Sequence, residues 1–205
     1  MTSNINLIIN MLEWCRNLKH LKKFIHFSTD EVYGTAPKGI DYKEGDRLNP
    51  GNPYSASKAA QESICRAYAN TYKLPIMITN TMNVIGERQD KEKFVPLVID
   101  KVLSGETVTI HSDKERKESG TRFYIHARNV ADAMHFLLIN ETETLDNVDA
   151  SKGQYNIVGE REISNLELAT LIAGVIGKPL KYEMVDFHSS RPGHDLRYAL
   201  SGVKM

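Results

Sequence analysis

The chain has 205 residues, of which 41% are hydrophobic and 25% are charged, and its formal net charge is zero. This length can bury a sizeable core in one domain or two small ones, and the balanced charge argues against a disordered tail or a protein dedicated to nucleic acid. The two cysteines, Cys15 and Cys65, indicate no disulfide framework and favour a reducing compartment. Because no apolar run reaches membrane-spanning length and no signal-peptide pattern opens the chain, we expect a cytoplasmic protein.

The first half of the chain is predicted to alternate helices and strands. Apolar residues at steps of three and four predict a helix, and short runs rich in strand formers predict buried strands. In chain order we expect a helix over 5–15, a strand over 24–28, a loop over 35–53, a helix over 54–72 and a strand over 75–81. This alternation is typical of a parallel sheet covered on both faces.

The second half is predicted to be less regular. We expect helices over 94–103 and 130–140, strands over 107–111, 154–158 and 180–185, and a solvated loop over 111–121. A capping box at Ser164–Glu167 opens one more helix, and Gly177 closes it. The seven histidines show no pairing with cysteine or acid at metal-ligand spacing, so we expect no metal site.

Tyr54 and Lys58 lie four residues apart on a predicted helix, and therefore on one face of it. A nearby ammonium favours the phenolate, so the lysine is expected to lower the pKa of the tyrosine. Such a phenol can take the proton from a sugar hydroxyl while a hydride leaves the same carbon. On its own the spacing is weak evidence, because tyrosine–lysine pairs are common on solvated helices.

Asp30 and Glu31 follow the apolar run 24–27, at the carboxyl end of a predicted strand. Open α/β sheets bind their ligands at this end, and two carboxyls whose pKa values are pushed apart can serve as an acid and a base. The alternative interpretation is a pair of loop or N-cap acids without chemistry.

With these motifs in place, the chain resembles the extended short-chain dehydrogenase/reductase proteins that act on nucleotide sugars, and most closely the dTDP-glucose 4,6-dehydratase type. The resemblance covers nearly the whole chain and rests on residues 28–34, 53–58, 83–86 (interpreted as a turn after a strand), 92–96 and 191–199. The triplet Thr29-Asp30-Glu31 is its discriminating part, because related epimerases usually lack this acid–base pair.

The resemblance implies an α/β fold, a partial doubly wound, Rossmann-like parallel sheet with a smaller α/β substrate-binding region. Residues 1–87 would form the C-terminal part of an NAD domain whose N-terminal strands are missing. Residues 88–205 would be mainly substrate-binding, with elements that return to the sheet.

The resemblance also implies roles for individual residues. Tyr54 would act as base on the hydroxyl of sugar carbon 4 as its hydride passes to NAD, with Lys58 binding the ribose. Thr29 would hydrogen-bond the same oxygen, Glu31 would remove the proton on carbon 5, and Asp30 would protonate the hydroxyl leaving carbon 6. The hydride then returns to carbon 6, so NAD is regenerated. The implied cofactor-binding residues are Ser28, Tyr54 and Lys58.

Substrate contacts are implied for five further residues. They are Asn83 near the diphosphate, Lys93 beside the nucleotide, Arg122 and Arg191 at phosphates, and His194 in the pocket of Arg191. A planar guanidinium suits bidentate phosphate contact. For Lys93 and Arg122, simple surface solvation is the alternative.

The sequence departs from the family pattern in one important respect. The Gly-x-x-Gly-x-x-Gly motif that lets a backbone approach the cofactor pyrophosphate occurs nowhere in the chain. Three hypotheses follow: a truncated dehydratase, a non-catalytic remnant or partner subunit that binds a nucleotide sugar, and an epimerase. We expect a homodimer or a complementing N-terminal chain, with no nucleic acid or membrane partner.

Overall fold

The computed structural model describes residues 2–190 and 196–205. The elements of the first half are α1 (Thr2–Cys15), β1 (Phe24–Thr29), the 3-10 helix η1 (Asp30–Tyr33), α2 (Pro53–Tyr72), β2 (Ile76–Thr81) and β3 (Asn83–Ile85). Those of the second half are α3 (Phe94–Ser104), β4 (Val108–Ser112), β5 (Thr121–His126), α4 (Ala127–Ile139), β6 (Gln154–Ile157), β7 (Glu162–Ser164), α5 (Asn165–Ile176), β8 (Tyr182–Asp186) and α6 (Phe187–Ser190).

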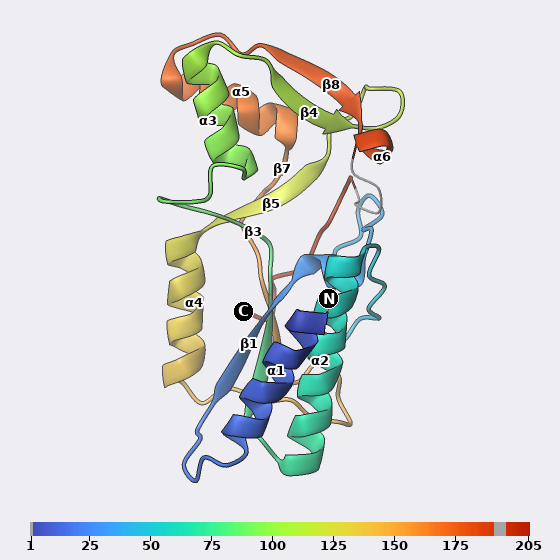
Figure 1. Cartoon of the computed structure of the whole chain (residues 1–205), viewed down its shortest axis with the longest axis vertical. Helices are drawn as coiled ribbons and strands as arrows, with labels where there is room; N and C mark the ends of the chain where they lie inside the picture. The colour runs from blue at the N-terminus through green and yellow to red at the C-terminus, as the bar shows by residue number, and fades with distance from the viewer. Residues whose placement is uncertain (1, 191–195) are drawn as a thin grey trace.

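The main sheet contains β1, β2 and β6 in that order, all parallel. Ile76 and Ile78 of β2 pack against α1 and α2, whereas Met77 between them packs against α4. Since neighbouring strand residues point to opposite faces, the two helices cover one face of the sheet and α4 covers the other. Figure 1 shows this arrangement in the lower part of the molecule. The expected parallel sheet covered on both faces is confirmed.

Helix α2 carries the tyrosine–lysine pair, and its start is defined by local chemistry. Asn52 is the N-cap: its side-chain oxygen accepts from the Ser55 amide at 2.9 Å, and Ser55 Oγ accepts from the Asn52 amide at 3.2 Å. Pro53 occupies the first turn, where its missing N–H costs nothing. Lys73 adopts a left-handed conformation at the other end, just before Pro75. These signals place the helix within a residue of the prediction.

A second unit lies at the other end of the molecule (Figure 1). There β4 and β8 pair in parallel, and α3 and α5 pack on them through buried side chains, among them Val98, Val102, Ile110, Ala169 and Ala173. Gly105 and Gly177 end the two helices in left-handed conformations (φ 75° and 74°) that favour glycine.

Two local predictions are corrected. Residues 83–85 form a strand rather than a turn, because β3 pairs in parallel with β5. The capping box before α5 is confirmed in its first half only. Ser164 Oγ accepts from the Glu167 amide at 3.1 Å, while the Glu167 carboxylate accepts from Arg161 at 2.5 Å.

Both cysteines are buried and free. Within residues 2–190 and 196–205, no helix combines the length and the apolar character that crossing a bilayer requires.

Candidate active site

The candidate active site lies where β1 ends and the chain turns into η1. Thr29 is the last residue of β1 and has extended backbone dihedrals, so it caps the short helix that follows. Its hydroxyl donates to Asp30 Oδ1 at 2.9 Å and accepts from the Glu31 amide at 3.4 Å. Thr29 therefore fixes the start of the acid pair.

Asp30 is a buried carboxyl whose pKa is higher than that of an ordinary aspartate. Its side chain accepts from Thr29, while Oδ2 has no hydrogen-bond partner among the described residues. Burial raises the pKa of Asp30 to about 6, and the Thr29 hydrogen bond and the charge of Arg122 oppose the rise. A carboxyl of this kind holds a proton up to a higher pH than an ordinary carboxyl and can deliver it.

Glu31 is held by a different contact. Its Oε2 accepts from the Asn52 side-chain amide at 2.9 Å. Asn52 is 7% exposed and also caps α2, so one side chain links the acid pair to the helix of Tyr54. The sequence prediction did not include Asn52, although an asparagine before a proline is a recognisable N-cap signal.

Tyr54 lies beside the acid pair. Burial, Glu31 and Asp30 raise the pKa of the Tyr54 hydroxyl, and a hydrogen bond with the Thr29 side chain opposes the rise. The tertiary structure thus brings together Thr29, Asp30, Glu31 and Tyr54. Tyr54 remains 50% exposed, so a ligand can approach its ring.

The direction of the Tyr54 pKa shift corrects the expectation that Lys58 lowers it. Lys58 Nζ donates to the Phe27 carbonyl oxygen at 2.5 Å. Burial lowers the pKa of Lys58 itself, and the Glu62 charge opposes this. Desolvation and the two nearby carboxyls therefore determine the direction of the Tyr54 pKa shift. The Lys58 ammonium is instead hydrogen-bonded to the backbone of β1.

Ser28 was expected to bind the cofactor, but its side chain is buried and donates to Glu62 Oε1 at 2.5 Å. The reason is strand alternation, because Ser28 points to the face that α2 covers. Glu62 was not predicted as a site residue. It lies four residues after Lys58, as Lys58 does after Tyr54, and this repeated spacing is the signal that could have found it.

The expected substrate-binding residues that the structure describes differ in where they lie relative to the acid pair. Asn83 is exposed in β3, shortly after β2 ends, and Lys93 is exposed at the start of α3. Arg122 lies close enough to lower the pKa of Asp30. Arg191 and His194 lie outside the described residues.

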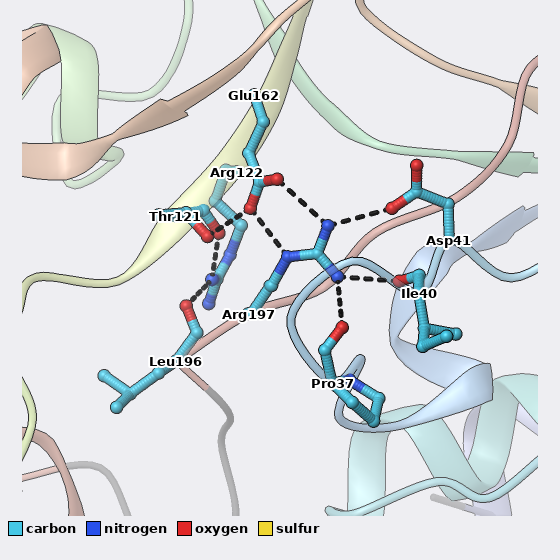
Figure 2. Close-up of polar contacts among 8 residues, drawn as sticks. All are labelled: Pro37, Ile40, Asp41, Thr121, Arg122, Glu162, Leu196 and Arg197. Atoms are coloured by element: carbon cyan, nitrogen blue, oxygen red, sulfur yellow. Dashed lines mark hydrogen bonds and ion pairs between the residues drawn. The ribbon is translucent and has the colours of Figure 1, made fainter.

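Arg122 is also part of a polar cluster (Figure 2). Its Nη1 donates to the carbonyl oxygens of Thr121 and Leu196, both at 2.6 Å, and its guanidinium stacks on the Tyr198 ring at 4.7 Å. These contacts hold the guanidinium in one orientation near the acid pair.

Arg197 is the centre of the same cluster, and the sequence prediction gave it no role. Its guanidinium forms two hydrogen bonds with Glu162, at 2.8 and 2.9 Å, and one with Asp41 at 2.8 Å (Figure 2). It also donates to the carbonyl oxygens of Pro37 and Ile40. Arg197 therefore ties the loop after η1 to β7.

Within the part of the chain that the structure describes, no group of three or more histidine, cysteine or acidic residues is arranged to hold a metal ion.

The model of the NAD-dependent epimerase/dehydratase family matches residues 1–157. The chain belongs to this family. The family is NAD-dependent, and its Rossmann-like α/β fold agrees with the parallel sheet described above.

Among individual family members, the chain is 33% identical over 191 residues to a dTDP-glucose 4,6-dehydratase of Xanthomonas campestris pv. campestris, covering 89% of this chain and 51% of that protein. The structure resembles dTDP-glucose 4,6-dehydratase from Bacillus anthracis in complex with NAD, with a TM-score of 0.83 and 31% identity over 98% of this chain and 59% of that one. It also resembles UDP-glucuronic acid 4-epimerase from Bacillus cereus in complex with UDP-glucuronic acid and NAD, with a TM-score of 0.84, 25% identity and the same coverage. This family member thus spans a little over half the length of these relatives.

Proposed function

We propose that the chain carries the acid–base and substrate side of a nucleotide-sugar 4,6-dehydratase, of the type that converts dTDP-glucose to dTDP-4-keto-6-deoxyglucose. The observation that carries the proposal is the buried Asp30 carboxyl, with a pKa of about 6, in the same site as the Tyr54 hydroxyl. An elimination needs a proton donor for the departing hydroxyl, and a carboxyl whose pKa is raised to about 6 meets that need better than an ordinary one.

Each polar group of the site has a task in this reaction. Tyr54, hydrogen-bonded to Thr29, would accept the proton of the carbon 4 hydroxyl in its phenolate form, which the positive charge of a bound nicotinamide would favour. Glu31, held by Asn52, would remove the proton on carbon 5, which the neighbouring ketone acidifies. Asp30 would protonate the hydroxyl that leaves carbon 6.

The residues fit one end of a nicotinamide dinucleotide. Tyr54 and Lys58 share a helix face at the carboxyl end of β1, and both retain exposure, so they could hold the nicotinamide ribose. NAD, when bound, would supply a hydride acceptor at carbon 4 and a donor at carbon 6. Ser28 would then support this end from beneath rather than touch the cofactor, because its hydroxyl is bonded to Glu62.

The other end of the cofactor needs a pyrophosphate site. No Gly-x-x-Gly-x-x-Gly motif occurs in the 205 residues. We infer that polypeptide outside these residues supplies it, for example a complementing chain, because a second copy of the same 205 residues would lack the motif as well. The position of β1 at an edge of the main sheet is compatible with added strands. We also propose a division near residue 87, with β6 of the later region returning to the sheet of β1 and β2.

The experiment is a turnover assay in D2O with dTDP-glucose and UDP-glucose, using the chain alone and with a polypeptide that carries the glycine motif. We expect a 4-keto-6-deoxy sugar with one deuterium at carbon 5, and NAD that stays bound through purification of the complete assembly. Tyr54→Phe is the inactive control. If neither the chain alone nor the complete assembly eliminates water from the sugar, the proposal is overturned.

An epimerase is the second candidate, because the epimerase structure is as similar in TM-score as the dehydratase. A 4-epimerase would change the configuration of carbon 4, lose no water and leave carbon 5 without deuterium. The same assay therefore separates the two. Binding of nucleotide sugar without turnover in either assembly would support the non-catalytic alternative.

A further inference from the structure

A buried chain of hydrogen bonds runs beneath the candidate active site, on the face of the main sheet that α2 covers. Its central member is Glu62, which is 1% exposed. Glu62 Oε1 accepts from Ser28 Oγ at 2.5 Å and from Asn80 Nδ2 at 2.7 Å. Ser28 and Asn80 are register partners on β1 and β2. One carboxyl of α2 therefore forms hydrogen bonds with two neighbouring strands.

The donors of this chain point in one direction. Arg66 donates to Gln154 Oε1, Gln154 Nε2 donates to Asn80 Oδ1 at 2.7 Å, and Asn80 donates to Glu62. Hydrogen bonds aligned in this way polarise one another. A cation therefore lies at one end of the chain and the Glu62 carboxyl at the other, and this arrangement opposes the rise that burial causes in the pKa of Glu62.

The contacts of Glu62 adjoin the site residues on both sides. Ser28 lies between Phe27, whose carbonyl oxygen accepts from Lys58, and Thr29. Asn80 Nδ2 also donates to the Thr29 carbonyl oxygen at 3.2 Å. Movement of Glu62 would thus shift Thr29 relative to the α2 face that carries Tyr54 and Lys58.

We propose that Glu62 is a positioning residue for the proposed reaction: it holds the end of β1 against α2, and its charge acts on Lys58 one helical turn away. The inference rests on the proposed function for its catalytic meaning, whereas its two physical consequences can be measured without turnover. Glu62 itself contacts no substrate, because the sheet and α2 enclose it.

The charge effect can be assigned because few titratable groups face Lys58. Glu62 and Cys65 face it from α2, and His26 faces it from β1. Burial lowers the pKa of Lys58, and Glu62 is the first group opposing it. Burial raises the pKa of Glu62, while Ser28, Asn80, Arg66 and Lys58 oppose that rise.

The first test is an NMR titration of the Lys58 side chain in the intact chain. Glu62→Gln preserves the shape of the side chain and removes its charge, so we expect the Lys58 pKa to fall. Glu141→Gln, a matched change at an exposed site after α4, should leave it unaltered. An unaltered Lys58 pKa in Glu62→Gln would overturn the proposal. If that variant fails to fold, the reciprocal measurement is made in Lys58→Met, where the Glu62 pKa should rise and an unchanged value would overturn it.

The second test addresses position. Ser28→Ala breaks the link to β1 and leaves the Glu62 side chain itself unchanged. We expect faster amide exchange at Thr29 and Glu31 than in the wild type, whereas unchanged exchange would refute a positioning role. In the complete assembly, Glu62→Gln should lower kcat, move the alkaline limb of its pH profile to lower pH and leave KM unchanged. A wild type without turnover counts against the proposed function alone, and the titration and exchange data still decide on Glu62.

Discussion

The side-chain nitrogen of Asn52 lies 2.9 Å from Oε2 of Glu31, while the oxygen of the same amide caps α2. The residue that begins the helix of Tyr54 therefore also orients the proposed base. Helix start and site geometry depend on one side chain, and the two roles can be separated by mutation.

We predict that Asn52→Ser and Asn52→Ala both reduce turnover, because neither side chain can donate to Glu31 across the same distance. Serine retains a good N-cap, so the alanine variant should be less stable than the serine variant by about 1 kcal/mol. Urea denaturation and product assays on both variants check this. Full turnover in Asn52→Ser would show that the contact with Glu31 is dispensable.

Tyr54→Phe should lower kcat by about 10²–10⁴-fold, because it removes the group that accepts the substrate proton. Stability should change little, since the ring is retained and half of it is exposed. Tyr72→Phe, at the exposed end of the same helix, is the matched control. Equal activity of the two variants would contradict the role of Tyr54.

Asp30→Asn should abolish proton donation and remove one pH dependence of stability. The folded-state pKa of Asp30 is about 6, above its ordinary value of 3.8, so the folded protein keeps a proton that the unfolded chain has released. The Asp30 contribution to stability is present at low pH and is lost as pH rises from about 4 to 6, by about 3 kcal/mol. The difference in unfolding free energy between wild type and variant, measured across this range, should follow that curve. Asp132→Asn, at an exposed site on α4, should produce no such difference.

His26 should affect the pH dependence of stability in the opposite direction to Asp30. Burial, with a smaller effect from the Lys58 charge, lowers the pKa of His26 from 6.5 to about 3, so the folded protein resists a proton that the unfolded chain accepts. Wild-type stability therefore falls as pH decreases from about 6.5 toward 3, by on the order of 5 kcal/mol at complete titration. His26→Leu should flatten this decline, because Nε2 is buried without a partner among the described residues. Acid denaturation profiles test it, with exposed His20→Leu as the control; identical profiles for His26→Leu and wild type would refute the assignment.

Much of the fold was predictable because its signals are local. The N-cap, the proline at the helix start and the apolar steps of α2 lie within a few residues of one another, and the end of β1 is marked by a change from apolar to acidic residues. The strand β3 was missed because Val84 and Ile85 become a strand only by pairing with β5, far away in the chain.

The site divides in the same way. The sequence by itself determined that Tyr54 and Lys58 share a helix face and that Thr29, Asp30 and Glu31 follow a buried strand, since backbone periodicity fixes both. Only the tertiary structure decided that Asp30 is desolvated, that Ser28 faces Glu62, that Asn52 holds Glu31 and that the pKa of Tyr54 rises. The physical reason is that burial and partner choice depend on which distant segments close over a side chain, and no local spacing encodes that closure.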